Sequence, residues 1–191
     1  MSIFDAIILG IIEGLTEFLP VSSTGHLIVV ERLLGIREPS LFFNTVIQLG
    51  AILAAVMYLR KHIIELFRDL FVAERRKKPL LFQFATLPVL VIGFVFHPII
   101  EQFQKSVIVV GVMSILIALL FMWGERRYKK SLREGAANTT RNKLGWREFL
   151  SIGLWQSLSV IPGVSRSGIT VFGGITKKLS FKDSTEMAFL L

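Results

Sequence analysis

The chain alternates long apolar runs with short clusters of polar and charged residues. Three runs are long enough to cross the hydrocarbon core of a membrane, which takes about 20 residues of helix. They are 42–59, 80–100 and 106–123. The short connection EQFQK at 101–105 makes the second and third runs an antiparallel hairpin. This pattern predicts an all-α polytopic integral membrane protein, with 1–191 forming a single transmembrane domain.

Two further apolar stretches, 1–36 and 149–176, are each interrupted by a polar turn. In the first, two half-length apolar pieces flank Pro20 and the sequence VSSTG; in the second, two such pieces flank PGVSRSG. Proline and a hydroxyl-rich turn break a helix, and irregular backbone at membrane depth needs protein or a water-filled cavity around it. Each stretch therefore predicts a re-entrant helical hairpin.

The two predicted hairpins resemble each other and start on opposite sides of the membrane. Aligning VSSTG at 21–25 with VSRSG at 164–168 gives an offset of 143, which pairs Glu13 with Gln156 and Ser22 with Ser165. Opposed broken helices are typical of an inverted repeat with its site near the midplane. The sequence ends in the apolar stretch STEMAFLL, so we expect the C-terminal repeat to be incomplete.

Charge gives the orientation of the spans. Lys and Arg number 22 against 14 Asp and Glu, a net charge of +8 that could suggest nucleic acid. Fifteen of these basic residues lie in two segments between predicted helices, 60–79 and 125–147. Basic connections flanked by apolar spans follow the positive-inside rule, so both segments are expected to be cytoplasmic and nucleic-acid binding is not expected. The chain has no Cys, which excludes disulfides and Cys-based metal sites.

Glu13 and Glu17 stand out because they are carboxylates in a segment predicted to lie within the membrane. They are four residues apart and share one helix face, where like charges repel. Ionised groups at membrane depth are costly, at roughly 3 kcal/mol each, so a cation or a proton should lie beside them. We interpret the pair as functional, the alternative being one Glu that is protonated or capped.

The turn VSSTGH places three hydroxyls, Ser22, Ser23 and Thr24, at the start of a predicted helix. Free amides and the positive end of the helix dipole converge there, which suits phosphate oxygens. Ordinary N-capping is the alternative explanation for the hydroxyls. His26 follows one turn into the helix, near both carboxylates, and is a candidate for proton transfer.

The second break carries Arg166, the only Arg or Lys between Arg147 and Lys177. Arginine can bind a phosphate through two hydrogen bonds, and Ser165, Ser167 and Thr170 can donate further bonds to the same oxygens. A structural arginine paired with a Glu is the alternative. Together, the two breaks predict a membrane site for a phosphorylated amphiphile.

These residues also carry a family resemblance. EGLTEFLPVSSTGH at 13–26 and PGVSRSGIT at 162–170 resemble the two signature motifs of the undecaprenyl-diphosphate phosphatase family, the type associated with bacitracin resistance. The intervening FNTVIQLGAILA is similar to that family too. The family's functional positions correspond to Glu13, Glu17, Ser23, His26, Ser165, Arg166 and Thr170.

The resemblance implies hydrolysis of undecaprenyl diphosphate to undecaprenyl phosphate and inorganic phosphate, which recycles the lipid carrier for peptidoglycan synthesis and confers bacitracin resistance. It implies a bacterial inner membrane protein whose site opens toward the periplasmic face. The expected partners are the polyprenyl diphosphate substrate and membrane lipids; a homodimer and a monomer both stay open. A transporter or flippase of lipid phosphates is the alternative function, because opposed hairpins also occur in transporters.

The mechanism expected from these residues has three parts. Glu13 and Glu17 hold a divalent cation, Mg²⁺ or Ca²⁺, or activate the nucleophile, since a lipid diphosphate adds negative charge to a site with one Arg. Ser23 is the candidate nucleophile and His26 the acid and base, with direct attack by water as the alternative. Substrate phosphates are bound by Arg166 and the hydroxyls of both breaks, namely Ser22, Thr24, Ser165, Ser167 and Thr170.

Overall fold

The computed structural model describes residues 1–36, 41–104, 106–133 and 144–191, and the regular elements in these ranges are helices. Three are long: α3 (Leu41–Phe71), α4 (Lys77–Gln104) and α5 (Val107–Arg133). The shorter ones are α1 (Ile3–Thr16), α2 (Ser23–Leu33), α6 (Trp146–Ser157), the 3-10 turn η2 (Leu158–Val160), α7 (Arg166–Thr176) and α8 (Phe181–Leu190). The predicted all-α fold is confirmed.

The three long helices cover the three predicted spans except for Ser106, which precedes α5, and each is long and apolar enough to cross a membrane. They also continue beyond the predicted ends. Residues 60–71 prolong α3 because they lack Gly and Pro and keep apolar side chains at helical spacing, although they carry Arg60 and Lys61. Much of the first basic segment is therefore helical. Residues 134–143 of the second basic segment lie outside the described residues, and 101–104 of the predicted turn prolong α4.

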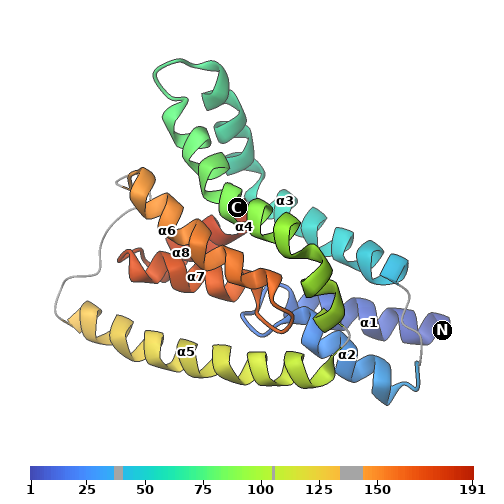
Figure 1. Cartoon of the computed structure of the whole chain (residues 1–191). Helices are drawn as coiled ribbons and strands as arrows, with labels where there is room; N and C mark the ends of the chain where they lie inside the picture. The colour runs from blue at the N-terminus through green and yellow to red at the C-terminus, as the bar shows by residue number, and fades with distance from the viewer. Residues whose placement is uncertain (37–40, 105, 134–143) are drawn as a thin grey trace.

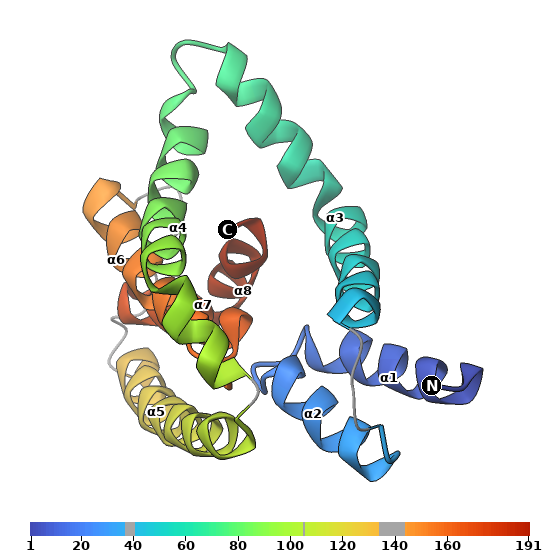
Figure 2. The same ribbon diagram turned by 45° about the vertical axis from the view of Figure 1, so that its right-hand side comes forward.

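Helices α3 and α4 meet at the connection 72–76 and diverge from it as the two arms of an inverted V (Figure 2). Large apolar side chains along the long helices are exposed, among them Phe42, Tyr58, Phe94 and Ile108. Exposed apolar surface on this scale is unusual for a soluble protein and is expected where lipid surrounds the helices. The chain is therefore a multi-pass membrane protein.

The two segments predicted as hairpins form pairs of short helices, and their re-entrant course in the membrane stays a prediction. Helices α1 and α2 pack against each other, as do α6 and α7, with α8 packed on α7. In Figure 1 the free ends of the α1–α2 hairpin point toward the side where the N-terminus lies, and the free ends of the α6–α7 hairpin point toward the opposite side. The turns of the two hairpins face each other near the middle. The relation of the hairpins as an inverted repeat remains a prediction.

The buried core lies between α4, α6 and α8. Phe82 and Phe149 pack edge to face with ring centroids 5.1 Å apart, and Ile152 and Met187 are almost fully buried beside them. Gly153 permits this packing, because a Cβ there would overlap the backbone carbonyl of Ala85 on α4. The core thus fixes the second hairpin against a long helix and sets the position of its break.

Candidate active site

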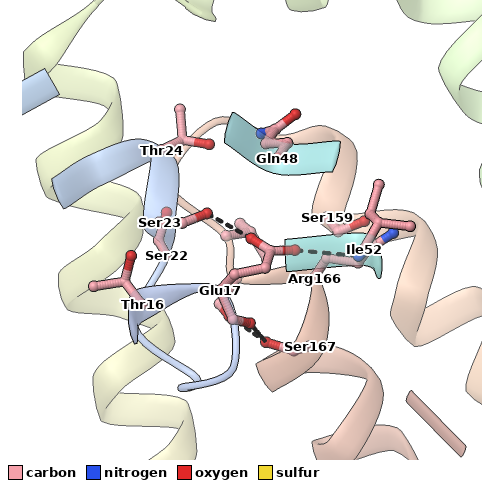
Figure 3. A pocket seen from close by; sticks show the side chains of 12 residues that line it. Thr16, Glu17, Ser22, Ser23, Thr24, Gln48, Ile52, Ser159, Arg166 and Ser167 are labelled. Carbon is pink, nitrogen blue, oxygen red and sulfur yellow. Dashed lines mark hydrogen bonds and ion pairs between the residues drawn. The ribbon is translucent and has the colours of Figure 1, made fainter. Parts of the chain in front are cut away.

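A cavity of about 270 Å³ lies where the two hairpin turns meet. Its walls come from the end of α1, the start of α2, the N-terminal half of α3, η2 and the start of α7 (Figure 3). The lining residues are Thr16, Glu17, Ser22, Ser23, Thr24, Gln48, Ile52, Ser159, Val164, Ser165, Arg166 and Ser167. Segments more than 100 residues apart in the sequence therefore share one polar hollow.

Ser22 determines the backbone conformation of the first break and caps the helix that follows it. Its φ of 58° places it in the left-handed region, where a side chain is strained, and its hydroxyl caps α2 by accepting a bond from the Gly25 N–H at 3.4 Å. Strained non-glycine backbone of this kind is concentrated at functional sites. The consequence is that α2 begins at Ser23 with its N-terminal turn in the cavity wall.

The second break repeats this cap. The Ser165 hydroxyl caps α7 by accepting a bond from the Gly168 N–H at 3.2 Å. Ser165 and Gly168 lie 143 residues after Ser22 and Gly25, the offset given by the sequence alignment. Both breaks thus present the N-terminal turn of an 11-residue helix to the cavity, and such turns favour anions because their N–H groups have no carbonyl partner within the helix.

Gly163 allows the chain to make the second turn. Its φ of +91° is one that L side chains rarely adopt, and a Cβ would come within 2.5 Å of the Val110 carbonyl on α5. The Ser114 hydroxyl of α5 donates to the Gly163 carbonyl at 3.2 Å. The contacts of Val110 and Ser114 with Gly163 therefore fix the second break against α5.

Glu17 joins the two breaks. Its Oε2 accepts a hydrogen bond from the Ser23 hydroxyl at 2.7 Å, and its Oε1 lies 3.2 Å from Arg166 Nη2 (Figure 3). The first partner comes from the same hairpin and the second from the other hairpin. Glu17 and Arg166 are the charged side chains among the lining residues, so the cavity wall carries one charge of each sign.

A second contact between the hairpins runs through Ser167. Its Oγ lies 3.3 Å from the Glu17 carbonyl oxygen, 3.5 Å from that of Leu19 and 3.2 Å from Ser165 Oγ. The hydroxyl has one proton to donate, so these acceptors share it. Ser167 is buried and therefore fixes the end of α1 against the start of α7.

Seven of the side chains proposed from the sequence line the cavity: Glu17, Ser22, Ser23, Thr24, Ser165, Arg166 and Ser167. Thr170 does not. Its hydroxyl is buried and donates to the Arg166 carbonyl at 2.8 Å, one turn back along α7. Thr170 therefore supports the backbone that carries Arg166.

Glu13 and His26 are also outside the cavity lining. The Glu13 side chain is fully buried, and neither carboxylate oxygen has a hydrogen-bond partner among the described residues. His26 is exposed, and its Nδ1 lies 2.9 Å from the Ser22 carbonyl oxygen. Because a carbonyl only accepts, Nδ1 must carry the hydrogen, which leaves Nε2 of the neutral ring free to take up a proton.

Sequence reasoning did not assign five lining residues: Thr16, Gln48, Ile52, Ser159 and Val164. Gln48 had a usable signal, since it is one of only two amides, with Asn44, in the sequence of the predicted span 42–59. Ser159 lies in the apolar piece before the second turn. Neither residue belongs to the polar turns in which the candidate residues were sought.

Comparisons with known proteins agree with the resemblance found in the sequence. A family model described as bacitracin resistance protein BacA matches residues 6–191. An undecaprenyl-diphosphatase from Chlorobium phaeobacteroides strain BS1 is 38% identical, and one from Chlorobium phaeovibrioides is 39% identical; each alignment covers 100% of this chain and 71% of the relative. An undecaprenyl-diphosphatase from Myxococcus xanthus is 36% identical, with 65% of its length covered.

Proposed function

Since the chain belongs to the family of the bacitracin resistance protein BacA, we propose that the cavity between its two helix breaks is where undecaprenyl diphosphate is hydrolysed. The chain is an undecaprenyl-diphosphatase, which releases undecaprenyl phosphate and inorganic phosphate. This reaction returns the lipid carrier to cell-wall synthesis and fits the antibiotic resistance in the family's name. The flippase alternative is not favoured. The observation that carries the choice of site is the contact of Glu17 with both Ser23 and Arg166.

The proposed nucleophile is Ser23. Its proton already points at Glu17 Oε2 across 2.7 Å, which is the geometry of a hydroxyl beside its general base. Attack by Oγ forms a bond to the terminal phosphorus while the bond from that phosphorus to the bridging oxygen breaks. The proton passes to Glu17, and undecaprenyl phosphate leaves. Water then hydrolyses the phosphoserine to inorganic phosphate; direct attack by water on the substrate is the alternative to this first step.

The proposed diphosphate site is formed by Arg166 and the two helix N-termini. The Arg166 side chain is 50% exposed, so its guanidinium is free to turn from Glu17 toward phosphate oxygens. Guanidinium groups bind phosphate through paired hydrogen bonds, and the N-terminal turns of α2 and α7 add amides and dipoles of the same sign. When Arg166 turns to the substrate, Glu17 gives up this ion pair and keeps its hydrogen bond from the Ser23 hydroxyl.

A divalent cation is the third part of the proposal. No cluster of three or more His, Asp and Glu side chains suited to a metal occurs in the described ranges. Mg²⁺, however, is often held by one or two carboxylates together with substrate phosphates. Glu17 lines the cavity, and Glu13, one turn earlier and buried behind it, has two unpartnered carboxylate oxygens. Glu13 and Glu17 would hold the ion, which when bound neutralises charge on the diphosphate.

His26 is proposed to transfer protons between the site and solvent. Its exposed ring and free Nε2 suit exchange with water, while its Nδ1 bond to Ser22 fixes the ring beside the first turn. If His26→Gln kept the wild-type rate at every pH between 5 and 8, this role would be wrong. Ser23 and Glu17 would then complete the proton transfer without it.

The proposed orientation follows from charge. The basic segments 60–79 and 125–147 follow the positive-inside rule, which supports a cytoplasmic location for both in a bacterial inner membrane and a periplasmic opening of the α1–α2 hairpin. Labelling of single cysteines at position 2 and position 74 with an impermeant thiol reagent would test this, since the chain has no native Cys.

A homodimer stays a prediction, to be checked by light scattering in detergent.

The test of the site is phosphate release from farnesyl diphosphate in detergent, with and without EDTA. Wild type, Glu17→Gln and Arg166→Ala are compared. We expect metal-dependent release from wild type and little from either variant. Unchanged rates in both variants would place the reaction elsewhere, and a rate that EDTA leaves unchanged would reject the cation.

A further inference from the structure

A second hollow lies next to the active-site cavity and is mostly apolar, although Lys182, Thr185 and Glu186 also line it. It has a volume of about 490 Å³ and lies between α3 and α8, beside the end of α1. We call it the α3–α8 groove. The apolar part of its wall is formed by Phe18, Ala54, Ala55, Leu59, Phe181 and Phe189.

The α3–α8 groove continues the active-site cavity along one face of α3. Gln48 and Ile52 line the cavity, whereas Ala55 and Leu59 line the groove. These four residues are spaced by four, three and four positions, which puts them in one stripe on the helix. A molecule that leaves the cavity along this stripe passes from polar to apolar surroundings within one helical turn.

The end of α1 makes the same transition. Glu17 lines the cavity and its neighbour Phe18 lines the groove, where the Phe18 ring lies 5.5 Å from the ring of Phe189 on α8. The carboxylate that binds Ser23 and a ring that lines the groove therefore belong to adjacent residues. Two separate elements, α1 and α3, join the polar hollow to the apolar one.

We propose that the α3–α8 groove binds the isoprene units of the lipid substrate that lie nearest to its diphosphate, an inference that rests on the proposed function. A prenyl diphosphate needs a polar site and an apolar path that begins at that site, and the groove supplies the path. A volume of 490 Å³ is too small for an eleven-unit chain. The remainder of the chain then lies in the surrounding lipid.

A third hollow, of about 440 Å³ between α4 and η2, is a weaker candidate. It is flanked by Leu158 and Val160, whose neighbour Ser159 lines the cavity. Successive side chains of a 3-10 turn point about 120° apart, so these two residues face away from the side that Ser159 presents. Among the described residues, no helix has a row of side chains that runs from the active-site cavity into this third hollow.

The groove can be filled without touching the proposed catalytic residues. Ala55 is a small, half-buried residue in its wall, and Ala55→Leu adds three carbons there. Ala118→Leu is the matched control, because Ala118 is an exposed alanine in the apolar part of α5 and lines none of the three hollows. Ile99→Trp fills the rival hollow beside α4.

The experiment measures kcat/KM for farnesyl diphosphate and for isopentenyl diphosphate, which has a single isoprene unit. The ratio of the two values is compared between variants, because a ratio within one sample does not depend on the folded fraction. We expect Ala55→Leu to lower the ratio about tenfold, the effect of about two methylene groups losing apolar contact. Ala118→Leu and Ile99→Trp should leave it unchanged.

Three other outcomes would overturn the proposal. Equal losses on both substrates would assign the groove to helix packing, within the chain or between two copies. A lower ratio in Ile99→Trp but not in Ala55→Leu would move the prenyl chain to the hollow beside α4. No phosphate release by folded wild type on either substrate would reject the proposed function itself, and the groove assignment with it.

Discussion

Replacing Glu17 with glutamine tests the centre of the site, because it removes one negative charge and keeps the shape of the side chain. The Ser23 hydroxyl donates to Glu17 Oε2 at 2.7 Å, and Arg166 Nη2 lies 3.2 Å from Oε1. A glutamine amide oxygen can still accept the serine proton in a hydrogen bond but cannot take it up. General base catalysis contributes about 10²- to 10⁴-fold, so we expect kcat to fall by about 10³-fold.

The same contacts predict that Glu17→Gln stays folded. The side chains of Arg166 and Glu17 are 50% and 21% exposed, and ion pairs with this degree of exposure contribute at most about 1 kcal/mol to stability. The melting temperature should therefore shift by no more than about 4 °C. Glu125→Gln is the matched control, since Glu125 is an exposed carboxylate 2.7 Å from Lys129 Nζ on α5 and does not line the cavity.

The assay is phosphate release at saturating farnesyl diphosphate, with circular dichroism melts of the same samples. A thousandfold loss in Glu17→Gln with a normal melt, beside full activity in Glu125→Gln, is the expected pattern. If Glu17→Gln retained most of the wild-type kcat, Glu17 would not be the base. The short contact with Ser23 would then only position the turn.

Three further predictions concern binding and stability. Arg166→Lys should lower kcat/KM by about 10- to 100-fold in the phosphate-release assay, because lysine cannot make paired hydrogen bonds to a phosphate. Ser22→Ala should be less stable than Ser22→Gly by about 1 kcal/mol, since only glycine adopts the φ of 58° without strain. Thermal melts measure the difference, and equal melting temperatures would contradict this prediction. Gly153→Ala should cost about 1–3 kcal/mol in the same melts by overlapping the Ala85 carbonyl, whereas Gly14→Ala, which has open space around it, should not destabilise.

The membrane spans could be predicted because each is a long apolar run, but their ends could not. Arg60 and Lys61 mark an interface in the sequence, yet α3 continues to Phe71 because the following residues favour helix and offer no break. Charge reports where a helix leaves the lipid, whereas Gly, Pro and capping residues report where it ends. Capping serines mark both breaks, at Ser22 and Ser165, which is why both were predicted close to their observed positions.

The candidate site was predictable where its residues lie in the turns. Ser23 and Arg166 are polar groups in short motifs, and the structure brings both to Glu17. Gln48 was missed because its contribution depends on which face of α3 meets the breaks, a matter of tertiary packing. Glu13 shares a helix face with Glu17, but spacing alone does not show that one lines the cavity and the other is buried behind it.

The contacts of Ser167 with the carbonyls of Glu17 and Leu19 have a consequence for biosynthesis. Glu17 and Ser23 are synthesised early in translation, but their partner Arg166 is made more than 140 residues later. Until α7 arrives, Glu17 has neither a guanidinium nor the serine that fixes its backbone. The site is therefore complete only once the second hairpin is in place, and a defect in its insertion disables residues that were made long before.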